Sequence, residues 1–261
     1  MKNRIKLINE VKEYYANIIT KNIEIKYDYE IELINLIDEI INTINSIEIN
    51  MDRQIYVGLL NSIKNMLKHF YDSLFLSNYY ISSLFIRMIA ENLIVFSVLI
   101  NNNSETTEYW QYWELLKKRN SMMIVNDNPI PEFKHFEDNL KFALSENDYK
   151  IVLKNSYGWA ISLGLNKSQC NLKQISLHQP NKILYKVFSE MSDRVHNSST
   201  AQFVNNIDME SSFLFICSEF GLLADALVKE LSHHFIKNDM IIKKFDKVYY
   251  KLLLTIDKNN Y

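Results

Sequence analysis

Apolar side chains recur every three to four residues along most of this chain, which is the spacing of an amphipathic α-helix. The pattern predicts long helices over residues 4–20, 28–48, 52–76, 78–100 and 208–236, and shorter ones over 107–124, 132–146, 147–163, 181–196 and 239–256. Loops are expected at 126–131, which contains two prolines, and at 164–180. The predicted fold is all-α: a bundle of long antiparallel helices in one domain, with a helical pair over 1–50 and the main bundle over 52–261.

Composition supports this prediction and excludes several enzyme classes. The 261 residues include only 4 glycines and 3 prolines, too few for the tight turns of a β-sheet protein. Four scattered glycines also cannot build a phosphate-binding P-loop, a dinucleotide-binding turn or a nucleophile elbow. The net charge of −2 gives no overall basic field for nucleic acid, although a local groove can still be positive.

The stretch 83–100 is the most apolar of the predicted helices, yet it carries Arg87 and Glu91 one turn apart. Because apolar residues surround both, we expect the two charges to be shielded from bulk water. Buried ions need charged or hydrogen-bonding partners, so the pair predicts a polar site. If Glu91 is buried and paired, Glu91→Ala is expected to cost on the order of 3 to 5 kcal/mol.

The predicted helix 181–196 supplies a second group of polar residues. Leu184, Met191 and Val195 share an apolar face, and Ser192 and His196 lie one turn apart along its edge. If the helix ends near His196, its negative dipole end favours a protonated imidazole, which suits a carboxylate such as Glu91. We therefore predict that Arg87 or Glu91 lies within hydrogen-bonding distance of Ser192 or His196.

Several of these residues carry a family resemblance. The spacing of Arg87 and Glu91, the segment 157–159 (Tyr-Gly-Trp), Tyr185, and the motif 192–198 (Ser-Asp-Arg-Val-His-Xaa-Ser) resemble an uncharacterised bacterial family of helical proteins, itself distantly similar to the HEPN superfamily. The resemblance covers roughly residues 55 to 205. It implies a helical bundle, often dimeric, that acts in toxin–antitoxin, abortive-infection or phage-defence systems. It also implies RNA and an antitoxin or other defence protein as partners, and endoribonuclease activity that requires no metal or other cofactor.

The chain departs from the HEPN signature, in which an Arg, a polar residue and a His lie on one helix with the His four to six residues after the Arg. Arg119 and Asn120 are followed by no such His, and Arg194 precedes His196 by only two residues. A nuclease here requires a recombined site. In it His196 moves protons, Arg87 or Arg194 stabilises phosphate charge, Glu91 orients the imidazole, and Ser192 binds phosphate.

Two alternatives remain open. The same polar residues also fit a structural role in a non-catalytic helical scaffold, because ion-pair networks and active sites use the same groups. A di-iron site is a remote alternative, built from Glu91, Glu132, His135, Glu190, Glu230 and His233. The surroundings of Glu132 are rich in charge and indicate a solvated face, which argues against that site.

Cysteine content and hydropathy indicate the compartment. Cys170 and Cys217 are too few for a disulfide scaffold, and we expect both to be small buried residues. The first ten residues regain charge before an apolar signal region forms, and the apolar stretch 83–100 is interrupted by charges. These features predict a cytoplasmic protein without a transmembrane segment.

Overall fold

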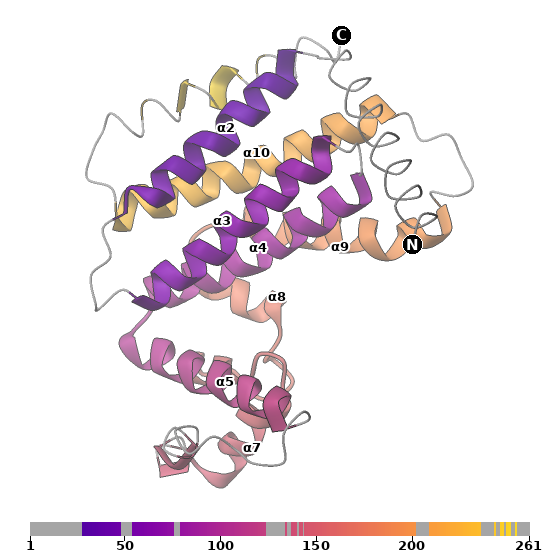
Figure 1. Cartoon of the computed structure of the whole chain (residues 1–261). Helices are drawn as coiled ribbons and strands as arrows, with labels where there is room; N and C mark the ends of the chain where they lie inside the picture. Colours follow the sequence, from indigo (N-terminus) through magenta and orange to yellow (C-terminus); the bar gives the residue numbers. More distant parts are fainter. Residues whose placement is uncertain are drawn as a thin grey trace, which may run out of the picture. The chain divides into compact units, whose positions relative to one another are not determined.

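A computed structural model gives the structure of the chain, and it describes residues 28–47, 54–75, 79–123, 144–201 and 209–235, with single residues or short runs at 134, 137–139, 141–142, 243, 246–247, 249–251 and 254. Helices joined by turns and short irregular segments make up these residues, and none of them forms a strand (Figure 1). The all-α fold class is therefore confirmed. The predicted helix 4–20 and the predicted loop 126–131 lie outside the described residues, as do most of the predicted helices 132–146 and 239–256.

The described residues fall into two compact units. Unit 1 comprises those within Met1–Leu93 and Lys186–Tyr261, and unit 2 comprises those within Ile94–Tyr185. Helix α4 (Tyr79–Asn101) and helix α9 (Ile183–Ala201) each contribute residues to both units. The number of independently folding domains stays a prediction, and each unit is described by itself below.

Unit 1 is built from long helices that bury one face each. It contains α2 (Asp28–Asn45), α3 (Gln54–Phe75), α10 (Met209–His234), and the parts of α4 and α9 up to Leu93 and from Lys186. Helix α2 packs against both α3 and α10 (Figure 1). The core residues recur at helical spacing: Leu33, Leu36, Ile37, Ile40, Ile44, Leu60, Ile63, Leu67, Phe70, Ile86, Ala90, Leu93, Val187, Met191, Ile216, Phe220, Leu223, Leu227 and Leu231.

Side-chain contacts connect α3 to its neighbours within unit 1. The ring of Phe70 stacks on that of Phe220 with 4.8 Å between centroids, which joins α3 to α10. The hydroxyls of Ser73 and Ser82 are 2.8 Å apart and satisfy each other in the core between α3 and α4. Buried polar groups are tolerated when they are paired in this way, so the two serines fix how α3 and α4 align.

Helix α4 is the most apolar of the described helices. By length and composition it is the one helix in the described part of the chain that is long enough to cross a membrane, and 61% of its most apolar window is buried inside the structure. A core helix of a soluble protein has the same properties. The helix is therefore weak evidence for a membrane span, and the cytoplasmic location stays a prediction.

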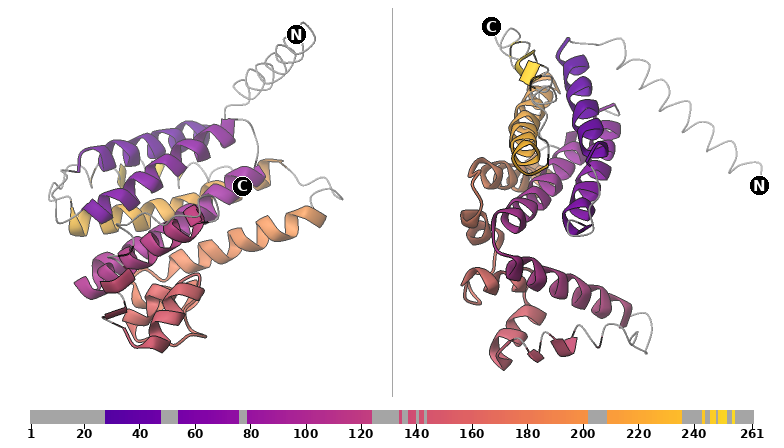
Figure 2. Two further views of the ribbon diagram at one scale, coloured as in Figure 1. Left: turned by 60° about the horizontal axis from the view of Figure 1, so that its bottom comes forward. Right: turned by 90° about the vertical axis from the view of Figure 1, so that its left-hand side faces the viewer.

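Unit 2 consists of shorter elements. It contains α5 (Ser104–Met123), α7 (Glu146–Lys154), the 3-10 helix η2 (Gly158–Leu163), α8 (Leu172–Ile175) and η3 (Ser176–His178). Helix α5 packs against α7 and η2, and Figure 2 shows these elements from two further directions. The indole N–H of Trp113 donates to the carbonyl of Asn155, 3.2 Å away. Trp113 and Trp159 are both buried.

Two predicted boundaries are wrong because local hydrogen bonds override the apolar pattern. The predicted helix 147–163 is interrupted after Lys154, where the side chain of Asn155 donates to the carbonyl of Ile151 and the chain then turns into η2. The predicted loop 164–180 contains α8, whose first turn is capped by the side-chain oxygen of Asn171, which accepts from the main-chain amide of Gln174. Both features lie in unit 2.

Candidate functional site

Helices α4 and α9 meet at one polar contact inside unit 1. The Nε–H of Arg87 on α4 donates to the Ser192 hydroxyl on α9, with 2.9 Å between the heavy atoms. The guanidinium carbon of Arg87 also lies 5.2 Å from the centre of the Phe188 ring, one turn before Ser192. The prediction that Arg87 or Glu91 lies within hydrogen-bonding distance of Ser192 or His196 is therefore confirmed by the Arg87–Ser192 bond. Their catalytic roles stay predictions.

The burial of this site differs from the prediction. Arg87 and Glu91 are both half-buried rather than shielded from water. They lie on the side of α4 where the core face ends, next to the exposed Met88, whereas Leu93 to Leu99 are fully enclosed. A half-exposed carboxylate keeps part of its hydration, so Glu91→Ala should cost much less than the 3 to 5 kcal/mol expected for a buried charge.

The directions of α4 and α9 bear on the predicted pairing of Glu91 with His196. Within unit 1, α4 and α9 run in opposite directions in both Figure 1 and Figure 2. Glu91 follows Arg87 by one turn and His196 follows Ser192 by one turn, so they lie on opposite sides of the Arg87–Ser192 contact. At about 1.5 Å per residue each is displaced by about 6 Å along the helix axis. This arrangement does not favour Glu91 as the residue that orients His196.

The position of His196 also corrects an electrostatic argument. Helix α9 continues to Ala201, so His196 does not lie in its last turn, and the helix-dipole reason for a protonated imidazole is wrong. The segment 197–200, predicted to end the helix, belongs to it. His196 itself is exposed, on the same side of α9 as Ser192. The His196 imidazole is therefore accessible from solvent.

A second polar group, which the sequence analysis missed, lies on the opposite edge of α9. Glu190 on α9 and Glu219 on α10 share a hydrogen bond between their carboxyl groups. Glu219 is only 5% exposed, and its Oε2 has no hydrogen-bond partner among the described residues. Burial is the main cause that raises the pKa of Glu219 to about 7, the charge and hydrogen bond of Glu190 add to it, and Lys186 opposes it. Two hydrogen-bonded carboxyl groups retain one proton between them.

Arg194 lies beside this pair rather than beside Arg87. It follows Glu190 by one turn on α9, and its guanidinium carbon is 5.1 Å from the centre of the Phe215 ring on α10. Its Nε is buried without a hydrogen-bond partner among the described residues, and burial lowers the pKa of the guanidinium. Of the two arginines considered for phosphate binding, the geometry therefore favours Arg87.

The residues of the remote di-iron alternative do not form a site in the described chain. Glu132 and His135 lie outside the described residues. Buried Glu230 has the Nε2 of His234 at 3.5 Å, while His233 is exposed. Among the residues that the structure describes, no group of three or more His, Cys, Asp or Glu side chains is positioned to hold a metal ion.

Both cysteines are buried, as predicted, and burial raises the pKa of the Cys170 thiol. A thiol with a raised pKa has little thiolate at neutral pH and is a weak nucleophile. Arg119 and Asn120 belong to α5, but their side chains lie outside what the structure describes.

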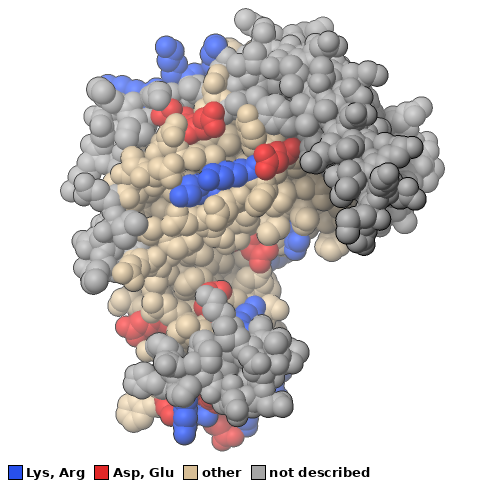
Figure 3. Space-filling model, viewed as in Figure 1, with Lys and Arg blue, Asp and Glu red and all other residues tan. Residues whose placement is uncertain are grey.

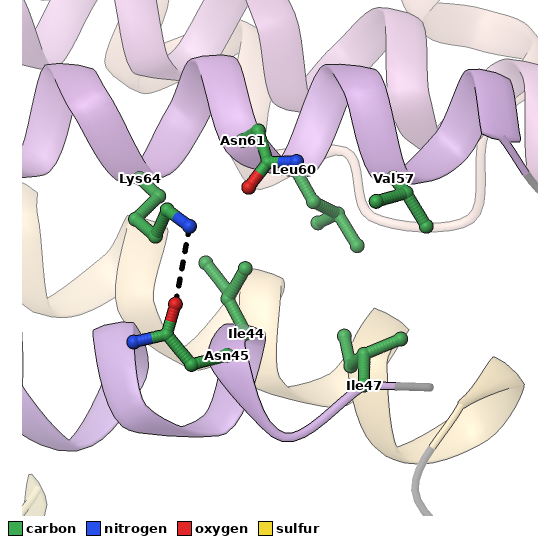
Figure 4. A pocket seen from close by; sticks show the side chains of 7 residues that line it. All are labelled: Ile44, Asn45, Ile47, Val57, Leu60, Asn61 and Lys64. Carbon is green, nitrogen blue, oxygen red and sulfur yellow. Dashed lines mark hydrogen bonds between the residues drawn. The ribbon is translucent and has the colours of Figure 1, made fainter. Parts of the chain in front are cut away.

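A small pocket between α2 and α3 contains none of the predicted site residues. Its volume is about 110 Å³, and Figure 4 shows apolar side chains directed into it from both helices. The lining residues are Ile44, Asn45, Ile47, Val57, Leu60, Asn61 and Lys64. The Lys64 ammonium donates to the Asn45 side-chain oxygen at 3.1 Å, so its charge is partly engaged. This lining has no nucleophile or acid–base pair and does not suggest catalysis.

The distribution of charged side chains on the surface limits how the protein can attract a polyanion. On the face drawn in Figure 3 the described surface is mostly uncharged, and its lysine and arginine side chains occur in small separate groups. This agrees with the net charge of −2. Any strong attraction for a polyanion must therefore come from a local arrangement of basic residues.

Comparisons with protein families, with curated proteins and with solved structures found no match.

Ser192→Ala is expected to lower the free energy of unfolding by about 1 kcal/mol, because the Nε–H of Arg87 loses its acceptor in a half-buried site. Ser189→Ala, on the same helix and also half-buried, is the matched control and should change it by less than about 0.5 kcal/mol. Urea denaturation followed by far-ultraviolet circular dichroism measures both variants. If the free energy of unfolding falls equally in Ser192→Ala and Ser189→Ala, the Arg87–Ser192 bond does not stabilise the fold.

Proposed function

We propose that this protein is an HEPN-like, cytoplasmic component of a defence or toxin system that acts on RNA, cleaving it without a metal ion. The observation that supports the proposal most directly is the Arg87–Ser192 contact between α4 and α9. It holds a guanidinium at a half-exposed site on the same side of α9 as an exposed histidine. Cleavage of a phosphodiester through the 2′-hydroxyl needs proton transfer, which histidine can supply, and stabilisation of phosphate charge, which arginine can supply.

Arg87 is prepared for an anion by its two contacts with α9. Ser192 accepts from Nε and Phe188 lies against the guanidinium, so the side chain is held in one orientation. Within the described chain neither contact uses the two terminal nitrogens, Nη1 and Nη2. These can donate to two oxygens of one phosphate, a pairing that arginine geometry favours.

His196 supplies the proton transfers in this proposal. As a base it removes the proton of the ribose 2′-hydroxyl, whose oxygen then attacks phosphorus while the bond to the 5′-oxygen breaks. The leaving 5′-oxygen takes up the proton that His196 has removed, directly or through water, and a 2′,3′-cyclic phosphate and a 5′-hydroxyl result. Arg87 stabilises the charge that accumulates on the phosphate oxygens. Glu91 has no assigned step, because α4 and α9 run in opposite directions, with Glu91 following Arg87 and His196 following Ser192 in sequence.

His196→Ala is expected to reduce RNA cleavage at least about 100-fold, since a positioned acid or base contributes roughly that much to rate. The thermal midpoint should stay near that of the unchanged protein, because His196 is exposed. His69→Ala is the matched control: His69 is an exposed histidine on α3, and its loss should leave cleavage intact. Cleavage of a fluorescent RNA is measured with and without EDTA, and activity should persist with the chelator.

Three results would contradict this proposal. They are the absence of RNA cleavage by the purified protein with its cellular partner removed, equal cleavage by His196→Ala and the unchanged protein, and complete inhibition by EDTA. The last result, together with two bound metals per chain, would restore the di-iron alternative, which elemental analysis detects directly.

A non-catalytic scaffold is the second candidate function. One observation favours it: both contacts of Arg87 join two helices of unit 1, which is what a structural arginine does. In that case the protein serves as a helical interaction module, as a homodimer or with a defence partner, and Arg87→Ala lowers stability and partner binding together. In a nuclease, Arg87→Lys keeps the charge and the fold but loses cleavage, because lysine cannot contact Ser192 and two phosphate oxygens at once.

A further inference from the structure

Charge is distributed unevenly along unit 2. Residues 149–185 contain five lysines, at positions 150, 154, 167, 173 and 182, and no aspartate or glutamate. The rest of the chain is correspondingly acidic, because the whole chain carries a net charge of −2. We call residues 149–185 the basic segment. A segment of this kind creates a local positive potential that the overall net charge conceals.

Most lysines of the basic segment are not neutralised by neighbouring acids. Lys154, Lys167 and Lys173 are exposed, and their ammonium groups form no hydrogen bond or ion pair with any described residue. Lys182 donates only to main-chain carbonyls, those of Leu177 at 2.7 Å and Gln179 at 3.2 Å. By contrast Lys150, at the start of the segment, is 2.6 Å from the Glu146 carboxylate. The excess positive charge is therefore concentrated after Lys150.

Part of the basic segment is well ordered by its own hydrogen bonds. The side-chain oxygen of Asn166 accepts from the amide and hydroxyl of Ser168 and from the amide of Gln169, which fixes the turn that carries Lys167. Lys173 and Leu177 are one turn apart across α8 and η3, and Lys182 folds back onto the carbonyl of Leu177. Lys173 and the Lys182 ammonium group are therefore both held near the main chain of Leu177.

We infer that the basic segment binds the phosphate backbone of single-stranded RNA. This inference rests on the proposed action on RNA and assigns the contact surface for that substrate. Lysines are point charges that attract phosphates without reading bases, so the binding should be independent of sequence. An anionic membrane is less favoured, because Leu177 is the one large apolar side chain exposed among the described residues of this segment, and interfacial binding needs a broad apolar face.

The test compares two triple variants that remove the same net charge. The first is Lys154→Gln with Lys167→Gln and Lys173→Gln. The control is Lys141→Gln with Lys186→Gln and Lys229→Gln, three lysines outside the basic segment that each lie 2.6 to 3.7 Å from a carboxylate oxygen. The probe is a 20-nucleotide 2′-O-methyl uridine RNA, which keeps the phosphates but cannot be cleaved through a 2′-hydroxyl. Its affinity is measured at several salt concentrations between about 50 and 200 mM, where electrostatic binding to nucleic acid weakens steeply.

Each phosphate contact on a single strand contributes about 0.7 to the slope of log affinity against log salt, so losing three contacts should reduce the slope by about 2. The first variant should also bind at least about tenfold more weakly at low salt. The control should bind nearly as the unchanged protein does. Equal losses in both variants would show that only net charge matters and would overturn the inference, as would absence of RNA binding by the unchanged protein.

The two proposals fail separately. RNA cleavage with normal probe binding by the first variant would overturn this inference and leave the proposed function standing. If probe binding depends on these lysines but the protein cleaves no RNA, the inference stands and the proposed function is overturned. Loss of binding to phosphatidylserine vesicles by the first variant, with RNA binding intact, would assign the basic segment to a membrane surface and overturn the inference.

Discussion

Gly158→Ala is expected to lower the stability of unit 2 by about 3 kcal/mol or more. A Cβ atom at Gly158 would lie 2.5 Å from both the Cα and the carbonyl oxygen of Val152 and 2.7 Å from the carbonyl oxygen of Ile151. These are main-chain atoms of α7, so relief requires η2 to move away from α7 rather than a side chain to rotate. Overpacking a well-packed core costs about 1 to 3 kcal/mol when side chains can adjust, and a main-chain clash should exceed that range.

Gly58→Ala is the matched control, because a Cβ atom there has no atom within 4 Å. Gly58 is exposed within α3, where alanine should raise helix stability by about 1 kcal/mol. All three tryptophans, at positions 110, 113 and 159, belong to unit 2, so tryptophan fluorescence during urea unfolding reports on that unit. The fluorescence midpoint should fall in Gly158→Ala and stay unchanged in Gly58→Ala. A normal midpoint in Gly158→Ala would mean that α7 and η2 are not packed as described.

The long helices could be predicted from the sequence because each buries one continuous apolar face. The predicted spans 28–48, 52–76, 78–100 and 208–236 correspond to α2, α3, α4 and α10 within three residues at each end. The short elements of unit 2 could not be predicted in this way. Their boundaries depend on single side-chain to main-chain bonds, such as that of Asn155, and on the close approach at Gly158. Apolar periodicity carries no information about either.

The candidate site was predictable only in part. A charged residue in a helix as apolar as α4 indicates a polar contact, and Arg87 has one with Ser192. The depth of burial was not predictable, because the edge of the core face depends on which helices cover α4. The same argument would have found Glu219, which lies between the buried Cys217 and Phe220 in another apolar helix. Its partner Glu190 could not be identified, since pairing across two helices depends on their register.

The Glu190–Glu219 pair should make the stability of unit 1 depend on pH. Burial raises the pKa of Glu219 from 4.5 to about 7, so the folded protein holds a proton that the unfolded chain releases. The resulting stabilisation is complete below pH 4.5 and is lost as pH rises to about 7. The loss is on the order of 3 kcal/mol. Glu219→Gln keeps a donor for Glu190 and carries no charge, so this variant should not show the loss.

The unfolding free energy of Glu219→Gln should equal that of the unchanged protein at about pH 4.5 and exceed it at about pH 8 by up to about 3 kcal/mol. Glu146→Gln is the control: this exposed carboxylate on α7 pairs with Lys150, which holds the pKa of Glu146 below its usual value. Its replacement removes a favourable charge above that pKa and so cannot raise stability at alkaline pH. Urea titrations followed by circular dichroism at both pH values give the comparison. Parallel pH profiles for Glu219→Gln and the unchanged protein would mean that the pKa of Glu219 is not raised in the folded state, and therefore that its carboxyl group is not buried beside Glu190 as described.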